Sequence, residues 1–370
     1  MKPGKSEIDP PVSNSGSAFT CLGVISLLSY NFFVQCLEVF VLRFGNRYAS
    51  DSHIIYGLSA TVGQILCILV RRKISPRTLI SVALFAISMI AFLCGFLAVV
   101  EVFHARLVGL SIASMMGLFI SVLQSSSSAI ASNISSSELL TAFYMGQSIS
   151  GFIPWPVTAW YYALFKYVAP LRKDEFIAAA SMLTGGIATF AFAVLFLNHS
   201  LPSGQSKQSS PDSPSVWSAF VSEWPIITLC WFTFVVSFTL YPRDLLNWSP
   251  SCDIDKSLYR SFLIYIAIIG DVCGMYLAAF ITVSPQSTQI FGYMRVVFIP
   301  LFSLISQIPI SSSLVQIISI LLMSISGGFI LASAMSQIQS NNQTVGYLVS
   351  ISLTIGIMVG STIGSIIDMF

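Results

Sequence analysis

One carboxylate lies within one of the most apolar parts of the sequence. Asp271 is near the centre of residues 259–285, YRSFLIYIAIIGDVCGMYLAAFITVSP. A helix of about 20 such residues crosses the ~30 Å hydrocarbon core of a bilayer. A carboxylate at mid-membrane costs roughly 2.5–3.5 kcal/mol on the insertion scale, so it faces protein or a water-filled cavity. Two interpretations stay open: Asp271 marks a transport pathway, or it is an inert buried carboxylate bonded to a neighbouring helix.

The first apolar segment also carries polar side chains on one face. Asn31, Gln35 and Glu38 follow the spacing i, i+4 and i+7, which places them on the same side of a helix. A polar face inside a membrane must look at other helices or at water. This pattern predicts either a lined cavity or a seam of interhelical hydrogen bonds.

Two further segments could contribute amide groups to the same cavity. Gln124 belongs to a stripe of serines within residues 121–128, and Gln147 lies shortly before Pro154 and Pro156. A proline removes a backbone donor, so this fifth segment is expected to be kinked. Transporters commonly build their sites at such bent helices. We therefore expect Gln124 and Gln147 to face the site.

Two residues are candidates for gating. Arg295 lies in the predicted ninth helix, about 8 Å nearer the cytoplasm than Asp271 by the rise of a helix. It is expected either to form a salt-bridged pair or inner gate with Asp271, or to extend toward the membrane surface. Tyr241, followed by Pro242, ends the seventh helix where an outer gate would lie.

Enzyme chemistry inside the membrane is not supported by the sequence. An intramembrane aspartyl protease needs two carboxylates and a Gly-x-Gly-Asp turn, whereas residues 268–271 read IIGD. A serine protease needs a histidine base near a membrane-embedded serine, and His53, His104 and His199 all lie at helix ends or in loops. The same histidines lack partners at metal-ligand spacing. We expect no catalytic residues, no metal and no cofactor.

The composition is that of a protein embedded in a membrane. Of the 370 residues, 55% are hydrophobic and 9% are charged, and the mean hydropathy is +0.83. Soluble domains carry about 25% charged residues. The net charge of +2 comes from scattered basic residues, which argues against nucleic-acid binding. We expect a polytopic protein whose surroundings are the lipid bilayer.

The hydropathy pattern predicts eleven membrane-spanning helices and an all-α fold. They cover roughly 18–42, 54–70, 78–100, 107–131, 139–166, 175–197, 217–241, 259–283, 289–308, 312–337 and 344–368. A Ser/Pro/Gln-rich stretch divides them into six and five. The predicted organisation is a disordered cytoplasmic tail (1–17), a six-helix bundle (18–197), a flexible cytoplasmic linker (198–216) and a five-helix bundle (217–370).

Orientation rests on the densest basic cluster, at residues 71–73 and Arg77, after the second helix. The positive-inside rule places this short connection in the cytoplasm. Eleven crossings then put the N-terminus in the cytoplasm and the C-terminus outside. Counted over all connections, the basic residues do not decide the orientation. The expected location is the plasma membrane.

Four short motifs, in order, resemble those of the equilibrative nucleoside transporter family. Residues 28–33, LSYNFF, correspond to its Leu-Pro-Trp-Asn-Phe-Phe type motif. Residues 122–124, VLQ, and 145–151, MGQSISG, are similar to its Leu-Gln and Gly-Gln-x-x-x-Gly signatures. Residues 295–300, RVVFIP, resemble its Arg-x-x-Phe-x-Pro motif. The similarity extends over most of the chain.

The resemblance implies a major-facilitator-like arrangement of two helical bundles that move nucleosides or nucleobases, mainly purines, by alternating access. Facilitated diffusion is the family's default, and Glu38 and Asp271, the carboxylates well inside spans, also allow proton coupling. The family's eighth helix reads Asn-x-x-Asp-x-x-Gly-Arg, but Ile268 and Met275 replace its Asn and Arg here. These two departures allow a nucleobase or an unusual substrate.

The expected site follows from the resemblance and from the matching of amides to base edges. The substrate-binding residues are expected to be Tyr30, Asn31, Gln124, Gln147 and Asp271; the gating or coupling residues are expected to be Glu38, Tyr241 and Arg295. No nucleic acid and no obligate protein partner is expected. The alternatives are a carrier of another small polar solute and a non-transporting membrane sensor or scaffold.

Overall fold

The computed structural model describes residues 12–45, 47–70, 73–100, 105–134, 138–198, 216–240, 248–251, 256–307, 313–338 and 343–367. Every regular element in these ranges is a helix. The elements are α1 (Val12–Gln35), α2 (Leu37–Phe44), α3 (Tyr48–Val70), α4 (Pro76–Val99), α5 (Ala105–Ile134), α6 (Glu138–Ser150), α7 (Pro154–Val168), η1 (Pro170–Arg172), α8 (Lys173–Asn198), α9 (Val216–Leu240), α11 (Lys256–Phe280), α12 (Pro285–Met294), η2 (Arg295–Val297), α13 (Phe298–Gln307), α14 (Ser313–Ser336) and α15 (Gln343–Ile367). Residues 1–11 of the predicted tail and 199–215 of the predicted linker lie outside the described residues, whereas residues 12–17, predicted to be disordered, are helical and belong to α1.

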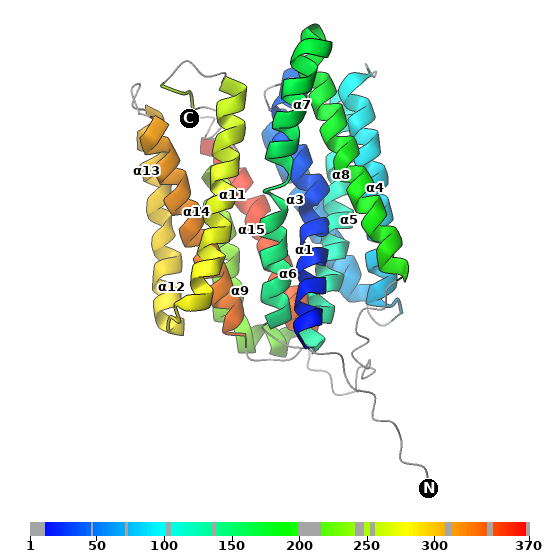
Figure 1. The fold of residues 1–370 in the computed structure, drawn as a ribbon. Helices are drawn as coiled ribbons and strands as arrows, with labels where there is room; N and C mark the ends of the chain where they lie inside the picture. Colours follow the sequence, from blue (N-terminus) through cyan, green and yellow to red (C-terminus); the bar gives the residue numbers. More distant parts are fainter. Residues whose placement is uncertain are drawn as a thin grey trace.

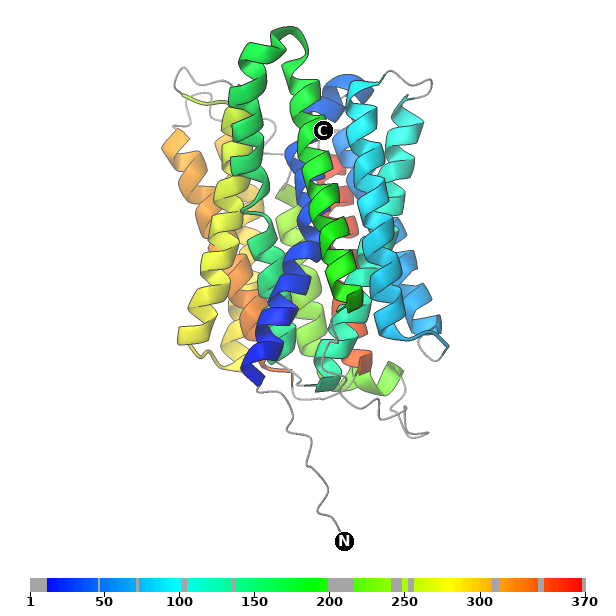
Figure 2. The same ribbon diagram turned by 45° about the vertical axis from the view of Figure 1, so that its right-hand side comes forward.

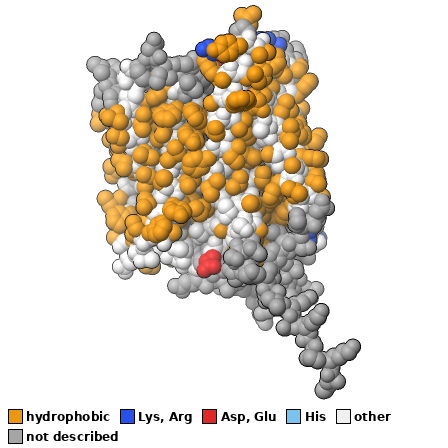
Figure 3. Space-filling view, in the orientation of Figure 1, with side chains coloured by type: hydrophobic (Ala, Val, Ile, Leu, Met, Phe, Trp, Pro, Cys, Tyr) orange, Lys and Arg blue, Asp and Glu red, His pale blue; other side chains and the backbone are white. Residues whose placement is uncertain are grey.

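Ten segments of the described chain are long and apolar enough to cross a membrane. The remaining predicted span, 139–166, is a broken helix made of α6 and α7, which follow one another from one end of the bundle to the other (Figure 1). The turn at residues 151–153 precedes Pro154, as the proline pattern predicts. Apolar side chains cover the visible flank between the two ends (Figure 3). The chain is therefore an integral, multi-pass membrane protein.

Two spans expected to be continuous are interrupted. The first ends as a helix at Gln35, and α2 begins after a turn at Cys36, so the helical face of Asn31 and Gln35 does not continue to Glu38. The Glu38 side chain lies outside the described residues. The ninth span contains a 3-10 turn, η2, that begins at Arg295. Pro300 cannot donate to the carbonyl of the preceding turn, which favours this interruption.

The helices pack in two groups joined by α15. The most extensive contacts within the first group are α1 with α6, α3 with α5, and α4 with α8; in the second they are α9 with α15 and α11 with α14. α15 also packs against α3 and α5, and it lies between the two groups in both views (Figures 1 and 2). α1 begins at the lower end in Figure 1 and α15 ends at the upper end.

Close packing of α11 on α14 fixes the depth and direction of Asp271. Gly270 and Gly274 of α11 face α14, and a Cβ on Gly270 would lie 2.8 Å from the Ser324 Cβ. At Gly274 a Cβ would lie 2.1 Å from the Ile325 carbonyl oxygen. Small residues at such an interface let two backbones approach closely.

We expect Gly274→Ala to destabilise the protein, because the added methyl group has no room at the α11–α14 contact. Overpacking of this kind costs about 1–3 kcal/mol. Thermal unfolding of the purified protein measures the effect. Gly16→Ala is the matched control, since nothing lies within 4 Å of a Cβ at Gly16. Equal melting temperatures for the two variants would contradict the packing described here.

Candidate functional site

A central cavity of about 250 Å³ lies between the two groups of helices. α1, α3, α5 and α6 line it from one side, and α9, α11, η2, α14 and α15 line it from the other. It brings together six predicted site residues from five segments of the chain: Tyr30, Asn31, Gln124, Gln147, Asp271 and Arg295. Their common position is an observation, whereas their roles in binding stay predictions. Tyr241 lies outside the described residues.

A chain of hydrogen bonds holds the two amides on the first wall. Asn31 Nδ2 donates to Ser150 Oγ at 2.5 Å, and the Ser150 hydroxyl donates to the Gln147 carbonyl oxygen at 2.5 Å. Gln147 Nε2 donates to Ser26 Oγ at 3.0 Å. Each side chain uses its amide nitrogen within the protein. The amide oxygens are thus oriented by neighbouring helices and can accept from a ligand.

Two pairs of aromatic rings line opposite sides of the cavity. Tyr30 of α1 stacks on Tyr56 of α3, with ring centroids 4.5 Å apart and an interplanar angle of 29°. Phe234 and Phe238 of α9 stack with centroids 5.9 Å apart and an angle of 20°. Aromatic faces of this kind pack against planar rings. Tyr56 and both phenylalanines are not among the site residues predicted from the sequence, although the i, i+4 spacing of the two phenylalanines places them on one face of α9.

Asp271 joins the two groups of helices. Its Oδ2 atom accepts a hydrogen bond from Ser148 Oγ of α6 at 2.5 Å. The backbones are close here, because a Cβ on Gly151 would lie 2.7 Å from Ile268 Cδ1. The carboxylate therefore lies where α6 and α11 meet at the edge of the cavity. The end of α6, just before its break, sets the position of the Ser148 donor.

Arg295 is buried, with 2% of its side-chain surface exposed, so it does not extend to the membrane surface. Its guanidinium donates from Nη1 to the Thr233 carbonyl oxygen at 2.8 Å and from Nη2 to the Met323 carbonyl oxygen at 3.1 Å. Two hydroxyls also accept from it, Ser237 Oγ at 3.0 Å and Ser326 Oγ at 3.2 Å. Gly327 leaves room for the group, since a Cβ there would lie 2.9 Å from Nη2.

The predicted ion pair between Asp271 and Arg295 does not form. Within the described part of the chain the ion pairs are Arg106 with Asp51 and Arg172 with Glu175, both at the ends of helices. The rise of a helix predicts how far apart Asp271 and Arg295 lie along the helix axis, but not which way each side chain points. Arg295 donates instead to backbone carbonyl oxygens of α9 and α14. The described residues also contain no group of three metal-ligating side chains.

The described helices fold like several solved transporters, among them a member of the major facilitator superfamily. A bacterial homologue of the human lysosomal transporter Spinster, inward-facing, has a TM-score of 0.63 at 13% identity, covering 96% of this chain and 82% of the other.

Two other solved transporters are similar over nearly the whole chain. The Escherichia coli fucose:proton symporter FucP has a TM-score of 0.62 at 14% identity, covering 97% of this chain and 91% of its own. The nucleoside transporter NupG has a TM-score of 0.61 at 12% identity, covering 96% and 92%. No protein-family model and no curated protein sequence matches. The major facilitator fold is thereby established, and the resemblance to equilibrative nucleoside transporters is not confirmed.

Proposed function

We propose that this protein carries neutral nucleosides or nucleobases, mainly purines, across a membrane by alternating access. The observation that carries the proposal is the single cavity shared by aromatic rings, amides, one carboxylate and one guanidinium from both groups of helices. Its volume of about 250 Å³ is just below the roughly 300–1,000 Å³ of small-molecule sites, so the cavity suits a small solute.

The lining suits a planar ring with polar edges. Tyr30 and Phe234 offer ring faces on opposite walls, and the Asn31 and Gln147 oxygens accept from ring or amino N–H groups. When ionised, the Asp271 carboxylate adds a group that only accepts hydrogen bonds. Serine and threonine hydroxyls on both walls can bond the hydroxyls of a ribose.

The charges of the cavity favour a neutral solute. It holds one carboxylate and one guanidinium. Four hydrogen bonds to protein already use four of the five N–H groups of Arg295. A phosphate group would face a single, largely satisfied cation and the Asp271 carboxylate. Nucleotides are therefore poor candidates, which favours an uncharged nucleoside or nucleobase.

Alternating access would use the two groups of helices as moving bodies. We assign residues 18–197 and 217–370 to them, with the N-terminus in the cytoplasm and the C-terminus outside the plasma membrane. The Ser148–Asp271 hydrogen bond would then break and reform in each cycle. Because Asp271 is a cavity carboxylate shared by both bodies, it is the group through which proton coupling would act; otherwise transport is facilitative.

A second candidate is a carrier of another small polar solute. The folds of the fucose:proton symporter FucP and of the Spinster homologue match as well as that of NupG does. A sugar would also use the carboxylate, amides and hydroxyls. The four aromatic rings on two walls favour the nucleoside, since they present more flat surface than one sugar covers. A non-transporting scaffold would have no need of this cavity.

Uptake of labelled adenosine, inosine, hypoxanthine and adenine into transport-deficient cells tests the proposal. We expect saturable uptake and competition among purines, and no inhibition by AMP. Uptake measured with and without a pH gradient separates proton-coupled from facilitative transport. Competition by sugars alone, with no effect of any base or nucleoside, would favour the second candidate.

We expect Phe234→Leu to raise KM for the transported purine because it removes one stacking face. Aromatic contacts contribute about 0.5–1.5 kcal/mol beyond buried area, which corresponds to roughly a two- to twelvefold rise. Kinetics of initial uptake measure it. Phe96→Leu is the matched control, because Phe96 is a largely exposed aromatic on α4, outside the cavity. An unchanged KM in Phe234→Leu would mean that the Phe234 ring does not contact the solute.

A further inference from the structure

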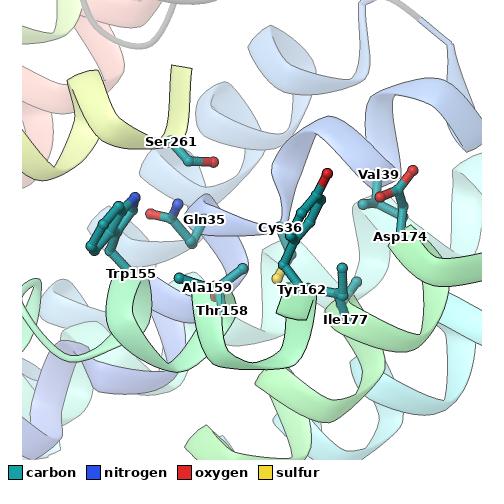
Figure 4. Close-up of a pocket in the computed structure, with 11 residues that line it drawn as sticks. Gln35, Cys36, Val39, Trp155, Thr158, Ala159, Tyr162, Asp174, Ile177 and Ser261 are labelled. Carbon is teal, nitrogen blue, oxygen red and sulfur yellow. The ribbon is translucent and has the colours of Figure 1, made fainter. Parts of the chain in front are cut away.

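A second, smaller cavity lies beside the central one, where α1 ends. Its volume is about 60 Å³, and α1, α7, α8 and α11 contribute its lining (Figure 4). Gln35, the last residue of α1, lines both cavities. A space of this size holds a few water molecules or one polar edge of a larger solute. It does not hold a complete nucleoside.

Two hydrogen-bond donors in this small cavity have no partner. Gln35 Nε2 and Trp155 Nε1 are buried, and neither makes a hydrogen bond in the described structure. The Gln35 side chain has only 7% of its surface exposed. Figure 4 shows Gln35, Trp155 and Ser261 among the residues that line the small cavity. A buried unsatisfied donor costs about 1–3 kcal/mol, so two in one cavity indicate a ligand that accepts hydrogen bonds.

The small cavity lies where the two groups of helices touch. Trp155 of α7 stacks on Tyr265 of α11, with centroids 4.9 Å apart and an angle of 21°. Phe152, in the break between α6 and α7, meets the same tyrosine edge-on at 5.7 Å. Tyr265 precedes Asp271 by six residues, or about 9 Å along the helix. One solute edge at Trp155 is thus within a molecule's length of the central carboxylate.

We propose that Gln35 and Trp155 form an entry station that binds the acceptor group of an incoming solute before the solute reaches the central cavity. The ligand class is a neutral heteroaromatic with an exposed carbonyl oxygen or ring nitrogen, which both N–H groups can approach. The station rests on the proposed function, since it names how that substrate enters. Because the Trp155 ring contacts α11, occupancy of the station is linked to closure of α7 on α11.

The indole N–H signal of Trp155 reports on the station directly. The protein contains six tryptophans, so 15N-tryptophan labelling of the purified full chain gives at most six indole signals. Trp155→Phe assigns one of them and keeps the stack on Tyr265. With adenosine or hypoxanthine at millimolar concentration, the Trp155 proton signal is expected to move downfield. Signals of Trp160 and Trp217, exposed on α7 and α9, are expected to stay. Gln35→Met, which keeps Trp155, is expected to reduce the movement.

The same titration in Asp271→Ala, which removes the central acceptor, separates the station from the central cavity. A shift that persists in this variant supports a separate station, and a shift that disappears overturns it because the signal then reports central binding. A Trp155 signal that stays fixed while adenosine binding is detected in the same sample also overturns the proposed station. The small cavity would then hold only water. If no base or nucleoside binds the wild-type protein, the proposed function itself fails and the station fails with it.

Transport gives a second readout. We expect Trp155→Phe and Gln35→Met each to lower Vmax/KM for adenosine about three- to tenfold, the value of one hydrogen bond. Trp160→Phe is the control, since Trp160 lies on the same helix with 70% of its surface exposed. Equal Vmax/KM in Trp155→Phe and Trp160→Phe would overturn the role in entry even if the signal moves.

Discussion

Replacing Arg295 by methionine should reduce transport at least about a hundredfold, a change worth about 2.7 kcal/mol. The guanidinium donates to carbonyl oxygens of α9 and α14 and to hydroxyls of both helices. Methionine fills similar space but leaves the Thr233 and Met323 carbonyls without these donors. Lysine keeps the charge but lacks the planar fork, so Arg295→Lys should recover only part of the activity.

Initial uptake normalised to surface expression measures the Arg295 effect. Arg106→Met is the matched control. Arg106 pairs with Asp51 at 2.5 Å, but its side chain is 51% exposed, and such pairs contribute about 0–1 kcal/mol. The control should therefore keep uptake within about twofold of wild type. Full activity in Arg295→Met, at normal expression, would mean that the buried cation is only a packing group.

Replacing Asp271 by alanine should lower Vmax/KM by a similar factor, about a hundredfold. The change removes both the acceptor offered to the solute and the contact with Ser148 across the two groups of helices. Ser148→Ala removes only the contact, so its effect should be smaller, about three- to tenfold. A Vmax/KM that is lowest in Asp271→Ala, intermediate in Ser148→Ala and highest in the wild type would indicate that Asp271 binds the solute and does not serve only as a structural contact.

Asp271→Asn tests the charge alone, because an amide oxygen can still accept from Ser148. If transport is proton-coupled, this variant should exchange labelled for unlabelled solute but not concentrate it against a gradient. If transport is facilitative, exchange and net uptake should fall together. Uptake by Asp271→Ala equal to wild type would exclude Asp271 from the site in both cases.

The helices and the polar residues of the cavity could be predicted from the sequence because hydrocarbon excludes both water and charge. Asp271 lies within an apolar run, so it had to face protein or water, and it lines the cavity. Arg295 lines the cavity too, although its position in the sequence also allowed it to extend to the membrane surface.

Other features depended on tertiary contacts that spacing does not contain. The sequence around the turn at Cys36 contains no proline or glycine that would predict a turn. Partner choice at Arg295 follows from which backbone carbonyls α9 and α14 present, and this depends on helix rotation. Tyr56 and Phe234 read as lipid-facing or core aromatics, because a ring has the same hydropathy whether it faces lipid or a cavity.

Since the carboxylate of Asp271 and the guanidinium of Arg295 share one cavity without touching, the space between them carries an electric field whenever Asp271 is ionised. In a medium of low polarisability such a field is weakly damped. A molecule that enters is turned until its own dipole lies along the line joining the two groups. Among rings of equal size and shape, those with a large dipole moment gain most, so selectivity can arise from charge distribution where shape offers none.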